Sequence, residues 1–181
     1  MDVRRLVYGL RPPALDDLGL VAAIRQQAES HGFVAHEAFS GATGDGVSGE
    51  TGLVFSLEAP GNMPTLPAAV EVACYRIAQE AITNVARHAY AKTCRVRLSV
   101  DRGASVLELE ITDDGAGIPG DRVAGVGLSS MRERAEELGG TCKVEPGPQG
   151  GTRVLARLSL LAPKAHAEGA TSSWSAPSAS S

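Results

Sequence analysis

Cysteine is scarce in this sequence, and the three cysteines are far apart. They stand at positions 74, 94 and 142 of 181 residues, without a C-x-x-C pair. An odd number of widely spaced cysteines argues against a disulfide framework and against a zinc site. All three fall in segments of apolar periodicity, which predicts small buried side chains in a protein of the reducing cytoplasm.

Long apolar runs and an excess of basic residues are also missing. No uninterrupted apolar run approaches the length that crosses a bilayer, and Met1–Arg5 lacks the apolar stretch of a signal peptide. Lys and Arg number 17 against 21 Asp and Glu, which gives a formal net charge of −4. These features predict a soluble chain without a nucleic-acid partner and without membrane contact by this segment.

Glycine and proline divide the sequence into helices and strands. An amphipathic stub over residues 1–10 ends at Pro12-Pro13, and Asp16 or Asp17 can cap a helix that runs to about His31, with Gly32 as its stop. The other expected elements are strands at 33–39 and 53–57 joined by a glycine-rich loop at 40–50, a helix at 66–90, strands at 95–100 and 107–111, a helix at 129–138, and a hairpin of 141–145 with 152–160.

The apolar periodicity also predicts which side chains are buried. On the long helix the buried face is expected at Val70, Ala73, Cys74, Ile77, Ala81 and Val85. The two strands that follow alternate cleanly, with Val96, Leu98, Val100, Leu107, Leu109 and Ile111 on one face and mostly charged residues on the other. Residues 162–181 are mostly Ala, Ser, Pro, Gly and Thr, and are expected to form a disordered tail.

The strongest local motif is Asp113-Asp114-Gly115-Ala116-Gly117, directly after an apolar strand. Glycines let the backbone approach a ligand closely or adopt a positive φ. A carboxylate at that position can accept a hydrogen bond from an amino group, or it can hold a metal. Taken alone, the motif fits an ordinary Asp-Gly turn between strands better.

A second motif, Glu80-x-x-x-Asn84-x-x-Arg87-His88, lies on the long helix. The spacing places Glu80, Asn84 and Arg87 in one strip along the edge of the apolar face. A carboxylate, a carboxamide oxygen and a cation suit a hydrated Mg²⁺ and phosphate oxygens. A solvated helix edge explains the same pattern, and His88, which is nearer the buried face, can equally be a packed or capping histidine.

Two further glycine motifs are weak when each is taken alone. Gly125-Val126-Gly127-Leu128 directly precedes a helix, whose free N–H groups favour an anion. Gly150-Gly151-Thr152 stands at the final hairpin, where turn chemistry explains it. The order in which the four motifs follow one another is much more specific than any one of them.

Together, the four motifs resemble the GHKL ATP-binding fold. More narrowly, the sequence looks like the ATP-binding domain of two-component sensor histidine kinases of the nitrate-sensor-like class, with typical stretches at Leu10–Leu20, Tyr75–Ala81 and Gly127–Ala135. The resemblance covers about residues 3–161. It implies an α+β fold, a two-layer α/β sandwich in which helices cover one face of a mixed, mostly antiparallel sheet.

The resemblance also implies a binding site for ATP. Asp113 matches the residue that binds the adenine amino group, and Gly115 and Gly117 match glycines that let the nucleotide pass close to the backbone. Thr152 matches a threonine that joins the adenine network through a water. Further nucleotide contacts are implied at Ile118 and, in the second glycine box at the end of a short lid, at Gly125, Val126, Gly127 and Leu128.

The helix motif matches the residues that the family places around Mg²⁺ and the phosphates. Asn84 matches the asparagine that binds Mg²⁺. Glu80 matches the acidic residue of the same box, and we expect it to be catalytic and to support the metal. Arg87 and His88 match positions that face the phosphates.

The histidine that receives the phosphate in this family lies on a dimerising hairpin that precedes the ATP-binding domain. Residues 1–13 resemble only the end of that hairpin and its linker, and residues 14–161 resemble the catalytic domain. His36-Glu37 has the right dipeptide, but it is expected on a strand, and neither His31 nor His166 has the needed setting. The sequence therefore predicts a cytoplasmic catalytic domain, which in a longer relative can be membrane-anchored. We expect it to act on a separate phosphoacceptor domain and, indirectly, on a response regulator.

Two other functions stay open at this level. An anti-sigma-factor serine kinase has the same fold and also occurs as a short separate chain. A non-catalytic ATP-binding docking module would use the nucleotide only to order its lid. The stretch Leu10–Pro13 and the helix that contains Met131–Ala135 favour the histidine kinase over the serine kinase.

Overall fold

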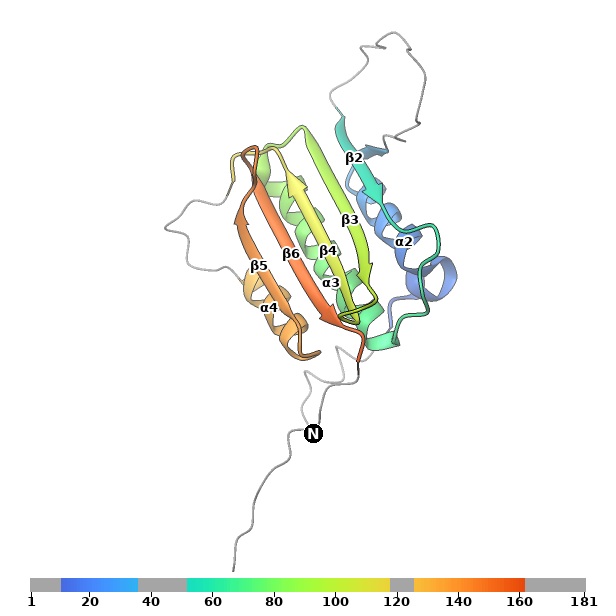
Figure 1. Cartoon of the computed structure of the whole chain (residues 1–181). Helices are drawn as coiled ribbons and strands as arrows, with labels where there is room; N and C mark the ends of the chain where they lie inside the picture. The colour runs from blue at the N-terminus through green and yellow to red at the C-terminus, as the bar shows by residue number, and fades with distance from the viewer. Residues whose placement is uncertain (1–10, 36–51, 118–125, 162–181) are drawn as a thin grey trace, which may run out of the picture.

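The fold is a six-stranded sheet with helices packed against one of its faces (Figure 1). A computed structural model describes residues 11–35, 52–117 and 126–161. The sequence predictions for residues 1–10, 36–51, 118–125 and 162–181, among them His36-Glu37, the glycine-rich loop and the tail, lie outside the described residues. Among the residues described, no helix combines the length and the hydropathy needed to cross a membrane.

The strands lie in the order β1-β2-β3-β4-β6-β5. The first two pairs in this order are parallel, and the other three are antiparallel. The bounds are β1 (Phe33–Ala35), β2 (Leu53–Glu58), β3 (Thr93–Asp101), β4 (Val106–Asp113), β5 (Thr141–Pro146) and β6 (Thr152–Ser159). A mixed, mostly antiparallel sheet with helices on one face confirms the predicted two-layer α+β fold.

Helix α2 (Pro13–Ser30) begins earlier than the sequence predicted, and it is interrupted. Neither Asp16 nor Asp17 caps it, because Pro12 takes the N-cap position and the Asp16 carboxylate pairs with Arg11 instead. Gly19 leaves the helical conformation at φ 75° and ψ 171°, so the element consists of two helical pieces joined at a kink. Gly32, with φ 79°, follows the helix end as predicted.

The long predicted helix is two elements in the structure. Helix α3 (Ala68–Asn84) is continued by one π-helical turn, η1 (Val85–Ala89), and the chain leaves it at Tyr90 in the left-handed conformation. All six residues predicted for the buried face are buried, which confirms the periodicity. The π turn is a departure from the predicted α-helix, and such turns are frequent at functional sites.

The two central strands contribute the middle of the core. Val96, Leu98, Leu107, Leu109 and Ile111 are buried in the core, and Val100 at the strand end is half-buried. Cys74, Cys94 and Cys142 are free and buried, as predicted. Burial raises the pKa of the Cys74 and Cys94 thiols to about 12 and that of Cys142 to about 11, so all three behave as small hydrophobic side chains.

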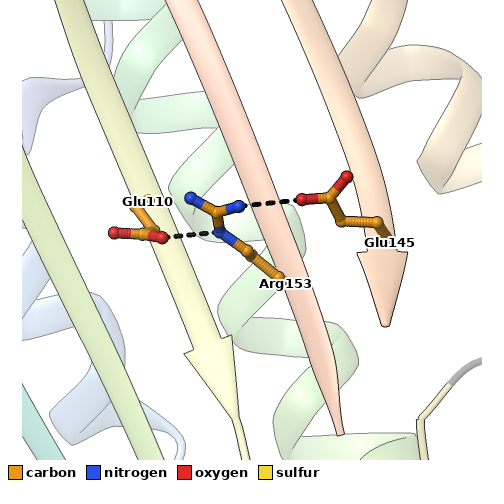
Figure 2. A network of polar contacts seen from close by, with 3 residues as sticks. All are labelled: Glu110, Glu145 and Arg153. Atoms are coloured by element: carbon orange, nitrogen blue, oxygen red, sulfur yellow. Dashed lines mark hydrogen bonds and ion pairs between the residues drawn. The ribbon is translucent and has the colours of Figure 1, made fainter. Parts of the chain in front are cut away.

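Charged side chains cover the face of the sheet that carries no helix. Arg153 on β6 reaches Glu110 on β4 at 2.6 Å and Glu145 on β5 at 2.9 Å, and Figure 2 shows the guanidinium between the two carboxylates. Arg157 and Glu108 form a similar pair at 3.3 Å. These pairs lie across neighbouring strands, so this face stays polar while the other face packs against the helices.

Helix α4 (Val126–Glu136) packs against β5, β6 and α3. It begins three residues before the predicted start at Ser129, so the second glycine box runs directly into its first turn. Figure 1 shows α3 and α4 side by side behind the sheet.

The core predicts a large effect for one substitution. Leu109 lies on the central strand β4 and is 0% exposed, so Leu109→Ala removes buried methyl groups and leaves a cavity. We expect a loss of about 2–5 kcal/mol in the free energy of unfolding, measured by urea denaturation. Leu161→Ala is the control, because Leu161 is 65% exposed and its loss should cost less than about 0.5 kcal/mol. Equal effects of the two substitutions would contradict the placement of the core.

Candidate functional site

Asp113, at the end of β4, is the one buried charged residue among those that the structure describes, with 8% of its surface exposed. Its Oδ1 accepts a hydrogen bond from the backbone N–H of Gly115 at 2.8 Å. Its Oδ2 has no partner among the described residues, and every fully buried side-chain oxygen or nitrogen there has one. The second oxygen can therefore accept a hydrogen bond from a ligand.

Asp114, the next residue, has a different environment. It is exposed, and its Oδ1 accepts hydrogen bonds from the backbone N–H groups of Lys92 and Thr93, each at 2.8 Å. Desolvation raises the pKa of this carboxyl group, but the hydrogen bonds from Thr93 and Lys92 outweigh it and lower the pKa below its usual value. The two neighbouring carboxylates thus have separate partners.

The first glycine box lets the end of the π turn approach the sheet. A Cβ at Gly115 would stand 2.1 Å from the carbonyl oxygen of Ala89, a distance that no side chain can adopt. The same oxygen accepts a hydrogen bond from the N–H of Ala116 at 2.7 Å. The chain after β4 therefore packs directly against the last residue of η1.

The final hairpin, formed by β5 and β6, packs against Asp113. A Cβ at Gly151 would stand 2.1 Å from the backbone oxygen of Asp113 and 2.7 Å from its Oδ1. Gly117 and Gly151 both have positive φ, at 74° and 70°. Thr152 follows as the first residue of β6, so the structure brings Asp113, Gly115, Gly117 and Thr152 to one end of the sheet.

The polar strip on α3 lies beside the start of α4. Glu80 is half-buried, and its Oε1 stands 2.0 Å from where a Cβ at Gly127 would be. Asn84 is half-buried and Arg87 exposed, as an edge position predicts. Neither has a side-chain hydrogen bond or ion pair with another described residue, which leaves both available to a ligand.

The remaining predicted site residues divide into three groups. Leu128 is partly buried and packs against the core. His88 and Val126 belong to η1 and α4, but their side chains are outside the description. Ile118 and Gly125 lie in the segment 118–125 and are also outside it. The structure adds three residues that the sequence reasoning missed as site residues, Ala89, Lys92 and Thr93, because their contribution is made by backbone atoms.

The side-chain oxygens of the site suit a metal ion that is held mainly by the phosphates of a bound substrate and by water. The described part of the chain contains no group of three or more His, Cys, Asp or Glu side chains that could hold a metal ion. Mg²⁺ usually keeps several waters and binds one or two protein oxygens together with substrate phosphates. Asn84 and Glu80, one helical turn apart on α3, fit that mode rather than a closed protein cage.

A separate hollow of about 330 Å³ lies at the opposite end of α3. Arg11 lines it and pairs with Glu71 at 2.7 Å. The other lining residues come from the start of α3 and the end of α4: Ala68, Ala69, Val72, Ala73, Arg134, Glu137 and Leu138. None of the predicted nucleotide residues lines it, so this hollow is not the candidate site.

Comparison with known proteins shows which protein family the sequence matches. Residues 69–162 match the family model described as histidine kinase-, DNA gyrase B- and HSP90-like ATPase. The chain is 34% identical over 168 residues to the sensor histidine kinase MctS of Rhizobium johnstonii, and these cover 90% of this chain and 32% of that protein. It is 37% identical over 162 residues to the signal transduction histidine-protein kinase/phosphatase UhpB of Salmonella typhimurium, covering 86% of this chain and 28% of that protein. The chain thus spans about a third of the length of these relatives.

Solved structures support the fold. A blue-light activated histidine kinase from Erythrobacter litoralis EL346 matches with a TM-score of 0.55 and 20% identity, over 78% of this chain and 45% of that chain. The histidine kinase domain of the same protein matches with a TM-score of 0.51 and 24% identity, over 59% of this chain and 51% of that chain.

The contact between Gly115 and Ala89 predicts a loss of stability when a side chain is added. In Gly115→Ala the new Cβ would collide with a backbone oxygen that cannot move without the π turn. We expect the free energy of unfolding to fall by about 1–3 kcal/mol in urea denaturation.

Gly61→Ala provides the matched control for this substitution. A Cβ at Gly61 meets no atom within 4 Å, so the change should be neutral or slightly stabilising. If Gly115→Ala were as well tolerated as Gly61→Ala, the packing of η1 on the glycine box would be wrong.

Proposed function

The chain belongs to the histidine kinase-, DNA gyrase B- and HSP90-like ATPase family, and we propose that it is the ATP-binding catalytic domain of a sensor histidine kinase. The observation that carries this proposal is Asp113, a buried carboxylate with one oxygen fixed by Gly115 and the other open to a ligand. The similarity to sensor histidine kinases over most of the chain supports the reaction class.

In this proposal Asp113 recognises the adenine base. Its Oδ2 accepts a hydrogen bond from the exocyclic amino group, and a buried hydrogen bond to a charged carboxylate contributes about 1.5–3 kcal/mol. Guanine presents an oxygen acceptor at the corresponding position, so it would face the carboxylate without a proton to share. Thr152 joins through a water, and Gly117 and Ile118 border the base.

The phosphates lie toward α3 and the start of α4. Asn84 and Glu80 would hold Mg²⁺, which would supply charge neutralisation at the phosphates. Arg87 and His88 face the phosphates, and Arg87 has no described partner that would compete. Val126, Gly127 and Leu128 form the first turn of α4, directly after Gly125 in the sequence, and the free backbone N–H groups of a helix N-terminus favour an anion.

The chemical step is the transfer of the γ-phosphate to a histidine on a separate dimerisation domain. Such a transfer depends chiefly on positioning and on charge stabilisation, and Asn84, Arg87 and the amides of α4 supply both. Glu80, the acidic residue of the same helix strip, is the residue that we expect to be catalytic. The response regulator receives the phosphate from the phosphohistidine and not from this chain. The partner that binds this chain directly is therefore the phosphoacceptor domain.

We assign the parts of the chain accordingly. Residues 1–13 form the end of the phosphoacceptor hairpin and its linker, residues 14–161 the catalytic domain, and residues 162–181 a tail. Arg11, held by Glu71 at the far end of α3, supports a junction on the side away from Asp113. ATP and a response regulator are both cytoplasmic, so the domain works in the cytoplasm.

The adenine assignment is tested by Asp113→Asn. The N–H of Gly115 needs an oxygen acceptor, so the asparagine places its amino group toward the adenine amino group, donor against donor. Calorimetry with ATP should show an affinity at least about tenfold weaker, and the wild-type chain should not bind GTP measurably. Asp17→Asn is the control, because Asp17 is exposed on α2. Unchanged ATP affinity in Asp113→Asn would remove the assignment.

The reaction is tested by mixing the chain with γ-labelled ATP and a separate hairpin domain taken from one of the similar sensor histidine kinases. We expect acid-labile, base-stable label on the hairpin histidine, and no label when EDTA removes Mg²⁺. Acid-stable label on a serine would indicate an anti-sigma serine kinase instead. ATP binding without transfer to any acceptor would indicate a docking module.

A further inference from the structure

We propose that Asp114 is a positioning residue of the nucleotide site: it holds the turn that presents Ala89 to the first glycine box and thereby orients Asp113. This inference deepens the proposed function and rests on it for the identity of the ligand. The resemblance of the motif implies a nucleotide contact for Asp113 but no role for its neighbour. Three sets of contacts carry the proposal.

The first set anchors Asp114 to the start of β3. Its Oδ1 accepts the N–H groups of two consecutive residues, Lys92 and Thr93, each at 2.8 Å. The carbonyl of Lys92 in turn accepts the N–H of Val54 on β2 at 2.8 Å. A charged acceptor with two backbone donors is among the stronger hydrogen-bond arrangements in proteins, so the end of β4 is tied to the beginning of two other strands.

The second set concerns the turn itself, in which Ala91 packs partly against the core. Only Tyr90 and Ala91 separate the end of η1 from Lys92. Tyr90 adopts the left-handed conformation, with φ 49° and ψ 32°, which is costly for a residue with a Cβ. Its side chain is 94% exposed, so packing of the ring does not hold this conformation. The restraints on Tyr90 therefore come from its neighbours, from the packing of Ala91 on one side and from the hydrogen bonds of Asp114 to Lys92 and Thr93.

The third set connects the turn to the ligand-binding carboxylate. The carbonyl of Ala89, directly before Tyr90, contacts the backbone at Gly115 and accepts the N–H of Ala116 at 2.7 Å. The N–H of Gly115 fixes Oδ1 of Asp113 at 2.8 Å. A displacement of the turn is thus transmitted through Ala89 and Gly115 to the atom that decides which way Asp113 faces.

The experiment compares Asp114→Ala with Asp114→Asn. Asp101→Ala is the matched control, because Asp101 also accepts a turn N–H, that of Ala104 at 2.9 Å, but at the other end of β3. Two quantities are measured in each full chain, namely the hydrogen exchange rate of the Ala116 amide by NMR and the ATP affinity by calorimetry, expressed per folded molecule.

We expect Asp114→Ala to speed exchange at Ala116, which Asp114 does not touch, and to weaken ATP binding about tenfold, as the loss of a charged hydrogen bond would. Asp114→Asn keeps a neutral oxygen acceptor and should recover part of both losses. Asp101→Ala should change neither quantity, even where it lowers the melting temperature.

Two results would overturn the inference. One is wild-type exchange at Ala116 in Asp114→Ala, and the other is unchanged ATP affinity despite a lower melting temperature, which would make Asp114 merely structural. If Asp114→Ala does not fold, Asp114→Asn decides by the same two measurements. If the wild-type chain fails to bind ATP, the proposed function is wrong, while exchange at Ala116 still decides whether Asp114 positions the glycine box.

Discussion

The candidate site depends on one close approach of backbone to backbone, where the carbonyl of Ala89 meets the chain at Gly115 and Ala116. This contact joins the end of the helical layer to the end of the central strand β4. The residues that we propose to face the nucleotide lie on its two sides, Asp113 on the strand side and Glu80 and Asn84 on the helix side. The contact is possible because position 115 has no side chain, so the last residue of η1 can approach the backbone there.

Close contacts within the protein are the main reason why glycine is needed at the site. Gly115 and Gly151 each admit a backbone atom of a neighbouring segment, and a Cβ at either position would stand 2.1 Å from that atom. Gly127 differs, because the atom that would meet its Cβ is the end of the flexible Glu80 side chain, which can move. The site thus stands at the end of a well-packed sheet. One face of the sheet is buried against the helices. On the other face the ion pairs of Figure 2 link neighbouring strands and help to keep the strand ends in register. A rigid frame of this kind positions reacting groups before the ligand arrives.

Much of this architecture could be predicted from the sequence, because it follows from local periodicity. Strict alternation at Leu107, Leu109 and Ile111 has a period of two, and it places those residues in the core whatever the rest of the fold does. The helical spacing that begins at Val70 fixes the face of α3 in the same way. The helix ends were less predictable. Asp16 looked like a cap but pairs with Arg11, and Gly19 interrupts a segment that has ordinary helical spacing.

The sequence by itself determined the elements, the polar strip on α3 and the order of the four motifs, since these depend on residues close together in the chain. Only the tertiary structure decided how the motifs meet. It paired the two carboxylates with different partners, Asp113 with Gly115 and Asp114 with the amides of Lys92 and Thr93, more than twenty residues earlier. It also placed the Ala89 carbonyl on the glycine box. The physical reason is that these contacts use backbone atoms, which every residue carries, so side-chain identity gives no sign of them until the strands and helices are packed.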